Sequence, residues 1–216
     1  MAFTSRVRAL IFANGDPPSS ALLGSLTSGV DMVIAADGGT RHSLDAGLVP
    51  NAVVGDFDSV DDEVRAKVPA DRFHRAGRLD TTDLEKAVAF AIENSAREID
   101  IVGAGGGRSD HALANLSVLT IHRGKASIRL HDELFEISLV DGETTVEGPV
   151  GTVISLFAIG ECRGVSTSGM RWELHDFTLP FGPRGVHNEI ARSPATVTVR
   201  SGDLLLFKGR FIEKHL

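Results

Sequence analysis

The chain has 216 residues but only one cysteine, Cys162, and it has no long hydrophobic run. A single cysteine cannot form an intrachain disulfide, which is typical of a reducing compartment, and it argues against a structural zinc site. No apolar run reaches the roughly 18 residues that a membrane-spanning helix needs. The first apolar run, Val7–Ala13, stops at Asn14 without the features of a signal peptide. We therefore expect a cytoplasmic protein that does not insert into membranes.

The sequence also has fewer basic than acidic residues. The 22 lysines and arginines are outnumbered by 29 aspartates and glutamates, which gives a formal net charge of −7. This balance argues against a nonspecific nucleic-acid binder, because such proteins need a positive surface. Phosphate groups can still be bound if metal ions and a few local cations neutralise them. With 42% apolar and 24% charged residues, the composition is that of an ordinary globular protein of one or two domains.

The first half of the chain alternates between strand-like and helix-like segments. Compact apolar runs followed by turn residues predict buried strands at Val7–Ala13, Met32–Ala36, Ala52–Val54 and Ile99–Val102. One predicted helix carries Leu84, Val88, Ala91 and Ile92 on a single face, and a second runs from about Ser109 to His122. Strands that alternate with helices indicate an α/β fold with a parallel sheet covered by helices.

The pattern changes near residue 125. The segments that follow are short, β-rich and separated by turn signals; they are Ile128–Leu130, Phe135–Val140, Thr144–Val146, Val153–Ala158, Cys162–Thr167, Thr196–Val199 and Leu204–Phe207. Such a pattern is typical of an antiparallel β-sandwich or barrel. We therefore predict an α/β domain over residues 1–125 and a β-sandwich domain over 126–216.

Four polar clusters stand at strand ends or turns of the predicted α/β half. They are Asp37-Gly38-Gly39, Gly55-Asp56-Phe57-Asp58-Ser59, Asp80-Thr81-Thr82-Asp83 and the glycine-rich segment Gly103–His111 (GAGGGRSDH). Ligands of open α/β sheets bind at the carboxyl ends of the parallel strands. We therefore expect all four clusters to meet at one edge of the sheet.

The acidic residues of these clusters fit a magnesium site. Asp56 and Asp58 are two residues apart, so both can converge on one cation, and Mg²⁺ prefers hard oxygen ligands combined with substrate phosphates. The alternative is a surface turn, in which aspartate is common. For Asp80 and Asp83 the alternative is helix capping, with Asp80 as the N-cap, and this is compatible with metal binding.

The glycine-rich segment predicts an anion site. Gly105, Gly106 and Gly107 let backbone N–H groups approach an anion, the helix start behind them adds a favourable dipole, and Arg108 can donate to two phosphate oxygens. It is neither a P-loop nor the Rossmann fingerprint, since Arg108 stands at the third glycine position. The alternative is a tight strand-to-helix turn, and His111 is either a ligand contact or a local hydrogen-bond partner.

Taken together, these clusters resemble the thiamine pyrophosphokinase family. The similarity covers nearly the whole chain; it is carried by ADGG (36–39), GDFDS (55–59), DTTDLEKA (80–87), GGGRSDHALANL (105–116), GMRWEL (169–174) and LPFGPRGVHNE (179–189). The resemblance implies an α/β nucleotide-binding half, a β-sandwich half, and a homodimer with its sites near the subunit interface. It also implies transfer of a diphosphate from ATP to the hydroxyl of thiamine, with Mg²⁺ as cofactor.

The resemblance also implies roles for individual residues. Asp56, Asp58 and Asp83 would hold magnesium and the ATP phosphates, with Asp80 in the same acidic cluster. The nucleotide and thiamine would be bound by Asp37, Gly38, Gly39, Ser59, Thr82, Gly105, Gly106, Gly107, Arg108, Asp110, His111, His187 and Asn188. Trp172 would stack on thiamine; core packing is the alternative for a lone tryptophan. The chain departs from the family at His187, where bacterial members typically have serine.

Three functions remain open at this point. The first is diphosphate transfer to thiamine, which the full set of clusters favours. The second is the same transfer to another hydroxylated heterocycle, motivated by His187. The third is a non-catalytic regulator that binds nucleotide or thiamine, against which the acidic cluster argues because binding alone needs fewer carboxylates near phosphate.

Overall fold

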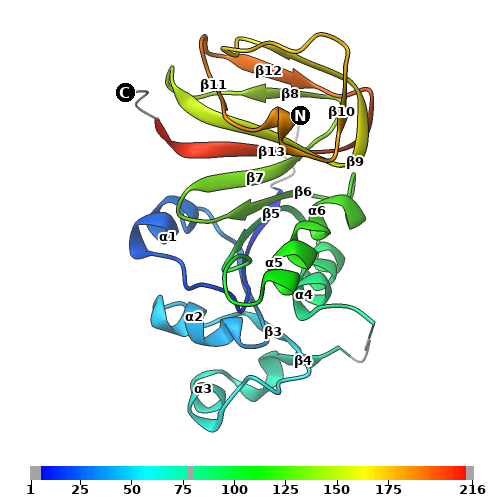
Figure 1. The fold of residues 1–216 in the computed structure, drawn as a ribbon. Helices are drawn as coiled ribbons and strands as arrows, with labels where there is room; N and C mark the ends of the chain where they lie inside the picture. The colour runs from blue at the N-terminus through cyan, green and yellow to red at the C-terminus, as the bar shows by residue number, and fades with distance from the viewer. Residues whose placement is uncertain (1–5, 77–79, 213–216) are drawn as a thin grey trace, which may run out of the picture. The chain divides into compact units, whose positions relative to one another are not determined.

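The computed structural model describes residues 6–76 and 80–212, and the chain divides into two compact units, Met1–Glu133 and Leu134–Leu216 (Figure 1). Each unit is described by itself. The division comes after the strand at Ser127–His131, whereas the sequence placed the boundary at residue 125. That strand pairs in parallel with Ala96–Val102 of the first unit.

The first unit contains a parallel sheet of six described strands. Its spatial order is β4-β3-β2-β1-β5-β6, and every neighbouring pair is parallel. The strands are β1 (Val7–Phe12), β2 (Met32–Ala36), β3 (Ala52–Gly55), β4 (Phe73–Arg75), β5 (Ala96–Val102) and β6 (Ser127–His131). The chain builds outward from β1 to β4 and then returns to place β5 on the other side of β1. The strand order therefore reverses between β1 and β5, which is where ligands bind in such folds.

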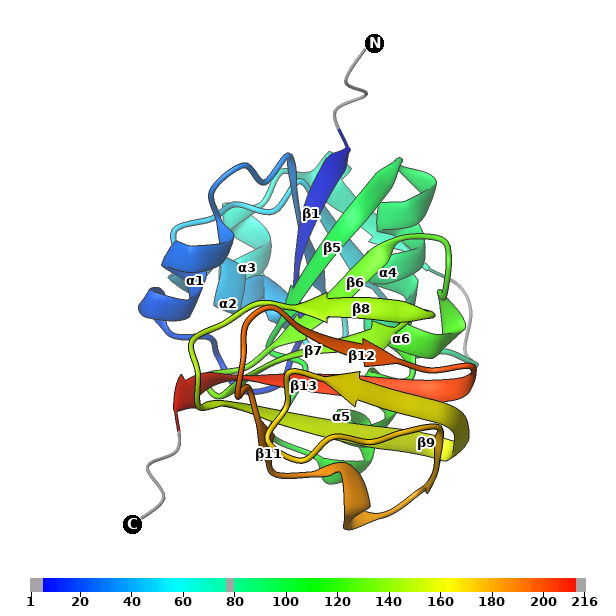
Figure 2. The same ribbon diagram turned by 90° about the horizontal axis from the view of Figure 1, so that it is seen from above.

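Helices cover both faces of this sheet. Figure 2 shows α1, α2 and α3 on one side of the strands and α4 and α6 on the other. The helices are α1 (Ser20–Leu26), α2 (Gly39–Asp45), α3 (Asp62–Lys67), α4 (Asp83–Glu93), α5 (Ser109–Leu116) and α6 (Val118–Ile121). In the described part of the chain, none of the helices has the length and hydropathy of a transmembrane span.

The apolar patterns explain these elements. Leu10 and Phe12 of β1 are fully buried against the apolar face of α1, and β5 is buried over its last four residues. Helix α4 buries Leu84 and Val88 and is capped by Thr82, whose hydroxyl accepts a hydrogen bond from the Glu85 amide at 3.2 Å. The N-cap is therefore Thr82 and not Asp80, because Thr82 directly precedes the helix and its hydroxyl makes the side-chain cap bond.

The second unit is built from antiparallel strands. Strand β13 (Ser201–Ile212) pairs with β7 (Phe135–Val140) and with β9 (Thr152–Ser168), while β12 (Ala195–Thr198) pairs with β9 and with β8 (Glu143–Val146). The short strands β10 (Phe177–Pro180) and β11 (Asn188–Glu189) add to β9. Buried apolar residues of these strands, among them Ile154, Leu179 and Leu204, form one core. The predicted fold class is therefore confirmed.

Strand β9 differs from its prediction in an informative way. The sequence indicated two strands separated by Ile159, Gly160 and Glu161, but the structure has one strand of 17 residues. Its pairing with β13 shifts register between Ser201 and Asp203, opposite this segment, and Gly160 has φ +82°. A glycine at a β-bulge looks like a turn in the sequence although the strand continues through it.

One buried histidine of the first unit predicts a pH dependence of stability. His122 is 5% exposed, and neither ring nitrogen has a hydrogen-bond partner among the described residues. Burial lowers the pKa of His122, the charge of Lys125 lowers it further, and Glu85 opposes them. The unfolded state therefore binds more protons than the folded state below about pH 6.5, so stability falls as the pH is lowered.

We therefore expect His122→Leu to reduce this acid sensitivity. Between about pH 7.5 and pH 5.5, the urea midpoint should fall less in the variant than in the parent protein. His74→Gln, at an exposed histidine of the same unit, serves as the control and should keep the parent's dependence. The same fall in H122L and parent would show that His122 does not titrate on unfolding.

Candidate active site

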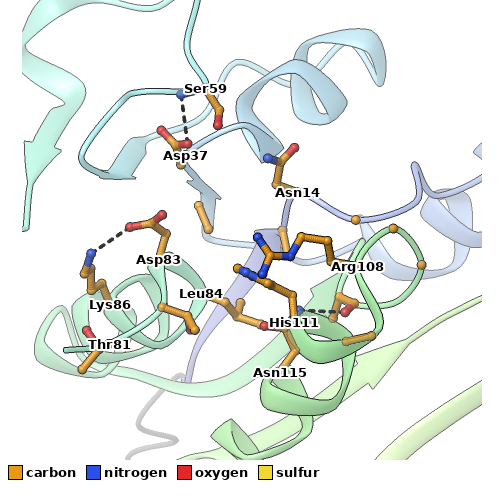
Figure 3. A pocket seen from close by; sticks show the side chains of 18 of the residues that line it. Asn14, Asp37, Ser59, Thr81, Asp83, Leu84, Lys86, Arg108, His111 and Asn115 are labelled. Carbon is orange, nitrogen blue, oxygen red and sulfur yellow. Dashed lines mark hydrogen bonds and ion pairs between the residues drawn. The ribbon is translucent and has the colours of Figure 1, made fainter. Parts of the chain in front are cut away.

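A cleft of about 560 Å³ lies in the first unit at the carboxyl ends of its parallel strands. This volume is in the range of small-molecule sites. Ten of its lining residues were predicted from the sequence: Asp37, Asp56, Asp58, Ser59, Thr82, Asp83, Gly106, Gly107, Arg108 and His111. In Figure 3, Asp37 and Asp83 face the cleft from one side and Arg108 from the other. The loops that follow β2, β3 and β5 and the start of α4 thus meet in one place.

Three carboxylates converge within this cleft. One oxygen each of Asp37, Asp56 and Asp58 lies within 4.8 Å of the other two. Asp37 follows β2, and the other two residues follow β3, the neighbouring strand. The amide of Asp58 donates to Asp56 at 3.3 Å, and the Ser59 amide donates to Asp37 at 3.3 Å. The first bond orders the loop after β3, and the second ties this loop to Asp37 in the loop after β2.

The environment of Asp37 fits a cation. The residue is 4% exposed, and its Oδ1 has no hydrogen-bond partner among the described residues. Burial raises the pKa of Asp37; hydrogen bonding with Ser59 opposes this rise, and the charges of Asp83 and Asp58 add to it. A buried carboxylate that has one oxygen without a partner and other carboxylates nearby is stabilised by a divalent ion. The oxygen-only donor set is the kind that Mg²⁺ prefers.

Asp83 lies in the cleft and pairs with a lysine of the same helix. Its carboxylate accepts a hydrogen bond from the Lys86 ammonium at 2.9 Å, and the Lys86 side chain is only 10% exposed. Both residues line the cleft, but Asp83 is not in the group of three converging carboxylates. Asp80 is exposed and is not among the lining residues. Lys86 therefore brings a positive charge directly beside the acidic cluster.

The glycine-rich segment packs tightly against the loop after β1. The Gly15 amide donates to the Gly103 carbonyl at 2.7 Å, and the Asp16 amide donates to the Gly105 carbonyl at 2.8 Å. A Cβ atom at Gly15 would lie 2.0 Å from the Gly105 oxygen, so only glycine fits there. Gly106 and Gly107 both have positive φ, +77° and +59°. The two loops on either side of the strand-order reversal therefore form one continuous wall of the cleft.

Gly38 and Gly39 have a structural reason for being glycine. A Cβ atom at Gly39 would lie 2.1 Å from the backbone oxygen of Phe12, and one at Gly38 would lie 2.4 Å from the Asn14 side chain. Neither glycine is among the lining residues; Gly38 is the N-cap of α2. These two glycines let the start of α2 approach β1 and its following loop closely.

Arg108 and Asp110 form an exposed ion pair at the start of α5. Arg108 donates from Nε and Nη2 to the two carboxylate oxygens of Asp110, at 3.1 Å and 2.6 Å. The hydrogen bond from Arg108 is the main cause that lowers the pKa of Asp110 to about 2. A carboxylate with so low a pKa is a weak base, so Asp110 is better suited to orienting the guanidinium. His111 lines the cleft, and its amide donates to Asp110.

The remaining predicted residues lie in the second unit. Trp172 is 52% exposed, which excludes core packing, and the Arg171 guanidinium lies 4.9 Å from its ring centroid. Asn188 receives a hydrogen bond from the Trp172 amide at 3.1 Å and donates to the Trp172 carbonyl at 2.7 Å. The His187 backbone has φ +71°, and its amide donates to the Ser155 hydroxyl. Asn188 therefore fixes the loop that presents the indole.

Three polar lining residues were missed from the sequence, namely Asn14, Lys86 and Asn115, and Thr81 was named there only as a member of its cluster. Lys86 lies at i+3 from Asp83, and that spacing on a helix is the signal that could have found it. Asn115 lies near the end of α5, the helix that Arg108 precedes, and its side-chain amide donates to the Ala104 carbonyl at 2.8 Å. Nothing in the local sequence distinguishes Asn14 from an ordinary turn residue.

Comparison with known proteins gives one consistent result. Residues 23–130 match the family model of the thiamin pyrophosphokinase catalytic domain, and residues 143–204 match that of the thiamin pyrophosphokinase vitamin B1 binding domain. The thiamine pyrophosphokinase of Bacillus subtilis (strain 168) is 31% identical over 186 residues, which cover 81% of this chain and 86% of that protein.

Solved structures and a plant relative agree. The crystal structure of the Bacillus subtilis thiamine pyrophosphokinase superposes with a TM-score of 0.83 at 28% identity, covering 94% of this chain and 98% of that one. Thiamine pyrophosphokinase 3 of Oryza sativa subsp. japonica is 31% identical over 170 residues, 71% of this chain and 63% of the rice protein. The chain therefore belongs to the thiamin pyrophosphokinase family.

Proposed function

We propose that this protein transfers a diphosphate from ATP to the hydroxyl of thiamine, giving thiamine diphosphate and AMP. The observation that carries the proposal is the convergence of three carboxylates with the glycine-rich loop and Arg108 in one cleft. This combination suits a metal-bound polyphosphate. That thiamine is the acceptor of the diphosphate is inferred from the chain's family. In the proposed division of labour, the α/β half binds ATP and the β-rich half binds thiamine.

Asp37, Asp56 and Asp58 are the residues that would hold Mg²⁺, with Asp83 beside them. When bound, the ion would neutralise charge on the phosphates of ATP. Asp83 is paired with Lys86, so we propose that Asp83 orients the lysine ammonium. Lys86 and Arg108 would contact phosphate oxygens from the two sides of the cleft, and the Gly106-Gly107 backbone would add N–H donors.

The proposed reaction is a direct displacement at the β-phosphorus of ATP. The hydroxyl oxygen of thiamine forms a bond to that phosphorus, the bond from it to the oxygen bridging the α- and β-phosphates breaks, and AMP leaves with that oxygen. The hydroxyl proton is released in the same step. Catalysis of this kind depends chiefly on positioning and charge neutralisation. Arg108 and Lys86 are placed to stabilise the charge that develops on the phosphates.

The exposed indole of Trp172 is the proposed stacking surface for the cationic thiazolium of thiamine. Trp172→Ala should raise the KM for thiamine at least tenfold and change kcat and the KM for ATP little, because only acceptor contacts are lost. Steady-state kinetics with each substrate varied in turn measure this. Phe181→Ala, at a similarly exposed aromatic residue of the same unit, should leave all three constants unchanged. An unchanged thiamine KM in W172A would remove Trp172 from the site.

The decisive test is product analysis with purified protein, ATP, Mg²⁺ and thiamine. Thiamine diphosphate and AMP should appear in equal amounts, and AMP should not appear without thiamine. ADP with thiamine monophosphate, or no thiamine-dependent AMP, would refute diphosphate transfer. Tight binding of both substrates without turnover would instead indicate a regulator.

A second candidate keeps the reaction and changes the acceptor. It is favoured by His187, whose strained backbone places a ring-bearing residue next to Asn188 and the Trp172 loop. A panel of hydroxylated heterocycles, compared by kcat/KM, separates the two candidates. A much better substrate than thiamine would establish the second. A cytoplasmic location and a homodimeric assembly remain predictions, and light scattering of the purified protein tests the latter.

A further inference from the structure

Phe57 has an unusual backbone conformation between two of the converging carboxylates. Its φ is +69°, in the left-handed region that bulky residues rarely adopt. Its neighbours Asp56 and Asp58 are exposed, whereas Phe57 itself is 9% exposed. The loop therefore turns its two acidic side chains outward and its ring inward. Such a conformation persists only where the surroundings determine it, and it is common at functional sites.

The surroundings of the ring are well defined. The Phe57 ring packs edge-to-face on Phe73 of β4, with centroids 5.3 Å apart and planes at 89°. The guanidinium groups of Arg65 and Arg75 lie 5.8 Å and 5.5 Å from the ring centroid. Val60, Val64 and other residues of one apolar cluster complete the pocket of the ring. Contacts from α3 and β4 thus hold the ring on several sides.

We propose that Phe57 is a positioning residue for the divalent ion. Its ring fixes the backbone between Asp56 and Asp58 so that both carboxylates stay within 4.8 Å of Asp37. Asp37 also has positive φ, +43°, and is tied to the same loop through the Ser59 amide. Without the anchor, the two carboxylates would have to be ordered when the ion binds, and this ordering would weaken binding. The inference rests on the proposed function, because it presumes that these carboxylates hold the ion.

The test compares metal binding in variants that separate the ring from the backbone conformation. Phe57→Gly accepts positive φ without strain but lacks the ring, and Phe57→Leu keeps an apolar side chain in the pocket. Mn²⁺ binding is titrated by electron paramagnetic resonance in the presence of α,β-methylene-ATP, whose bridge cannot be cleaved. We expect the Mn²⁺ Kd to rise about tenfold in F57G and at most about threefold in F57L.

A matched control tests whether general destabilisation of the apolar cluster is enough to weaken Mn²⁺ binding. Val68→Ala deletes buried apolar volume from the same cluster at a residue outside the acidic loop, and it should lower the melting temperature but leave the Mn²⁺ Kd unchanged. A folded F57G that binds Mn²⁺ as tightly as the parent would overturn the inference and leave the proposed function standing. A parent that binds no Mn²⁺ would overturn the metal site and the inference together.

If F57G does not fold, Phe73→Leu replaces it, because this change removes the ring contact from outside the loop. The Mn²⁺ Kd should then rise about threefold. Binding equal to that of the parent would again contradict a positioning role.

Discussion

Asp56→Asn should lower kcat for thiamine-dependent AMP formation about a thousandfold while leaving the protein folded. The amide keeps the oxygen that accepts the hydrogen bond from the Asp58 amide, so the loop loses no backbone contact. It removes one negative charge from the three carboxylates that would bind the ion. A loss of about 4 kcal/mol of transition-state stabilisation corresponds to this factor, and metal ions contribute several kcal/mol in such reactions.

Two comparisons make this result specific. Asp62→Asn makes the same chemical change at an exposed position in the first turn of α3 and should keep nearly full activity. Asp37→Asn should be as damaging as D56N if Asp37 is the third ligand, whereas Asp83→Asn should then cost less. Circular dichroism and melting curves show whether each variant is folded. A folded D56N with more than about a tenth of the parent's kcat would contradict the metal role.

The fold was largely predictable because its signals are local. Buried parallel strands appear as short apolar runs that end in turn residues, and β1, β2, β3 and β5 were found in this way. The short helices α1, α2 and α3 and the three-residue β4 were not, since segments of three to seven residues carry less than two turns of periodicity. The sequence placed strand β6 in the antiparallel part. Its parallel pairing with β5 cannot be predicted from the residues of β6 alone.

The candidate site was predictable as a set of loops but not as a set of contacts. The rule that ligands bind at the carboxyl ends of parallel strands brought the four clusters to one sheet edge, and the cleft lies there. Which carboxylates converge depends on loop conformation. Positive φ at Asp37 and Phe57 brings Asp37 to Asp56 and Asp58, and the Lys86 ammonium pairs with Asp83. The positive φ values have no signature in the spacing of residues, and the lysine pair has only the i+3 spacing of Asp83 and Lys86.

A buried ionic cluster joins three neighbouring strands of the parallel sheet, β1, β5 and β6. Asp100 on β5 is directly opposite Arg129 on β6 in the register of the sheet, and Arg8 lies on β1, two residues before Leu10, the residue opposite Asp100. Its carboxylate, 1% exposed, accepts hydrogen bonds from Arg8 and Arg129 at 2.8–2.9 Å and lies 2.8 Å from the His131 ring. Burial alone would raise the pKa of Asp100, but the hydrogen bonds from His131, Arg129 and Arg8 and the charge of Arg129 hold it far below its usual value.

Asp100→Asn should therefore cost about 3–5 kcal/mol of unfolding free energy, the range expected when one partner of a buried ion pair is removed. The amide has nearly the same shape, but it leaves Arg8 and Arg129 without the shared negative charge. Because the pKa is lower in the folded state, the contribution of Asp100 is complete above about pH 4 and is lost only at lower pH. Urea unfolding near neutral pH measures the effect. Asp31→Asn, at an exposed carboxylate that accepts the Arg8 amide, is the control and should cost less than about 1 kcal/mol. Equal unfolding free energies of D100N and D31N would mean that the desolvation cost of burying the Asp100 carboxylate offsets the stabilisation from its ionic contacts.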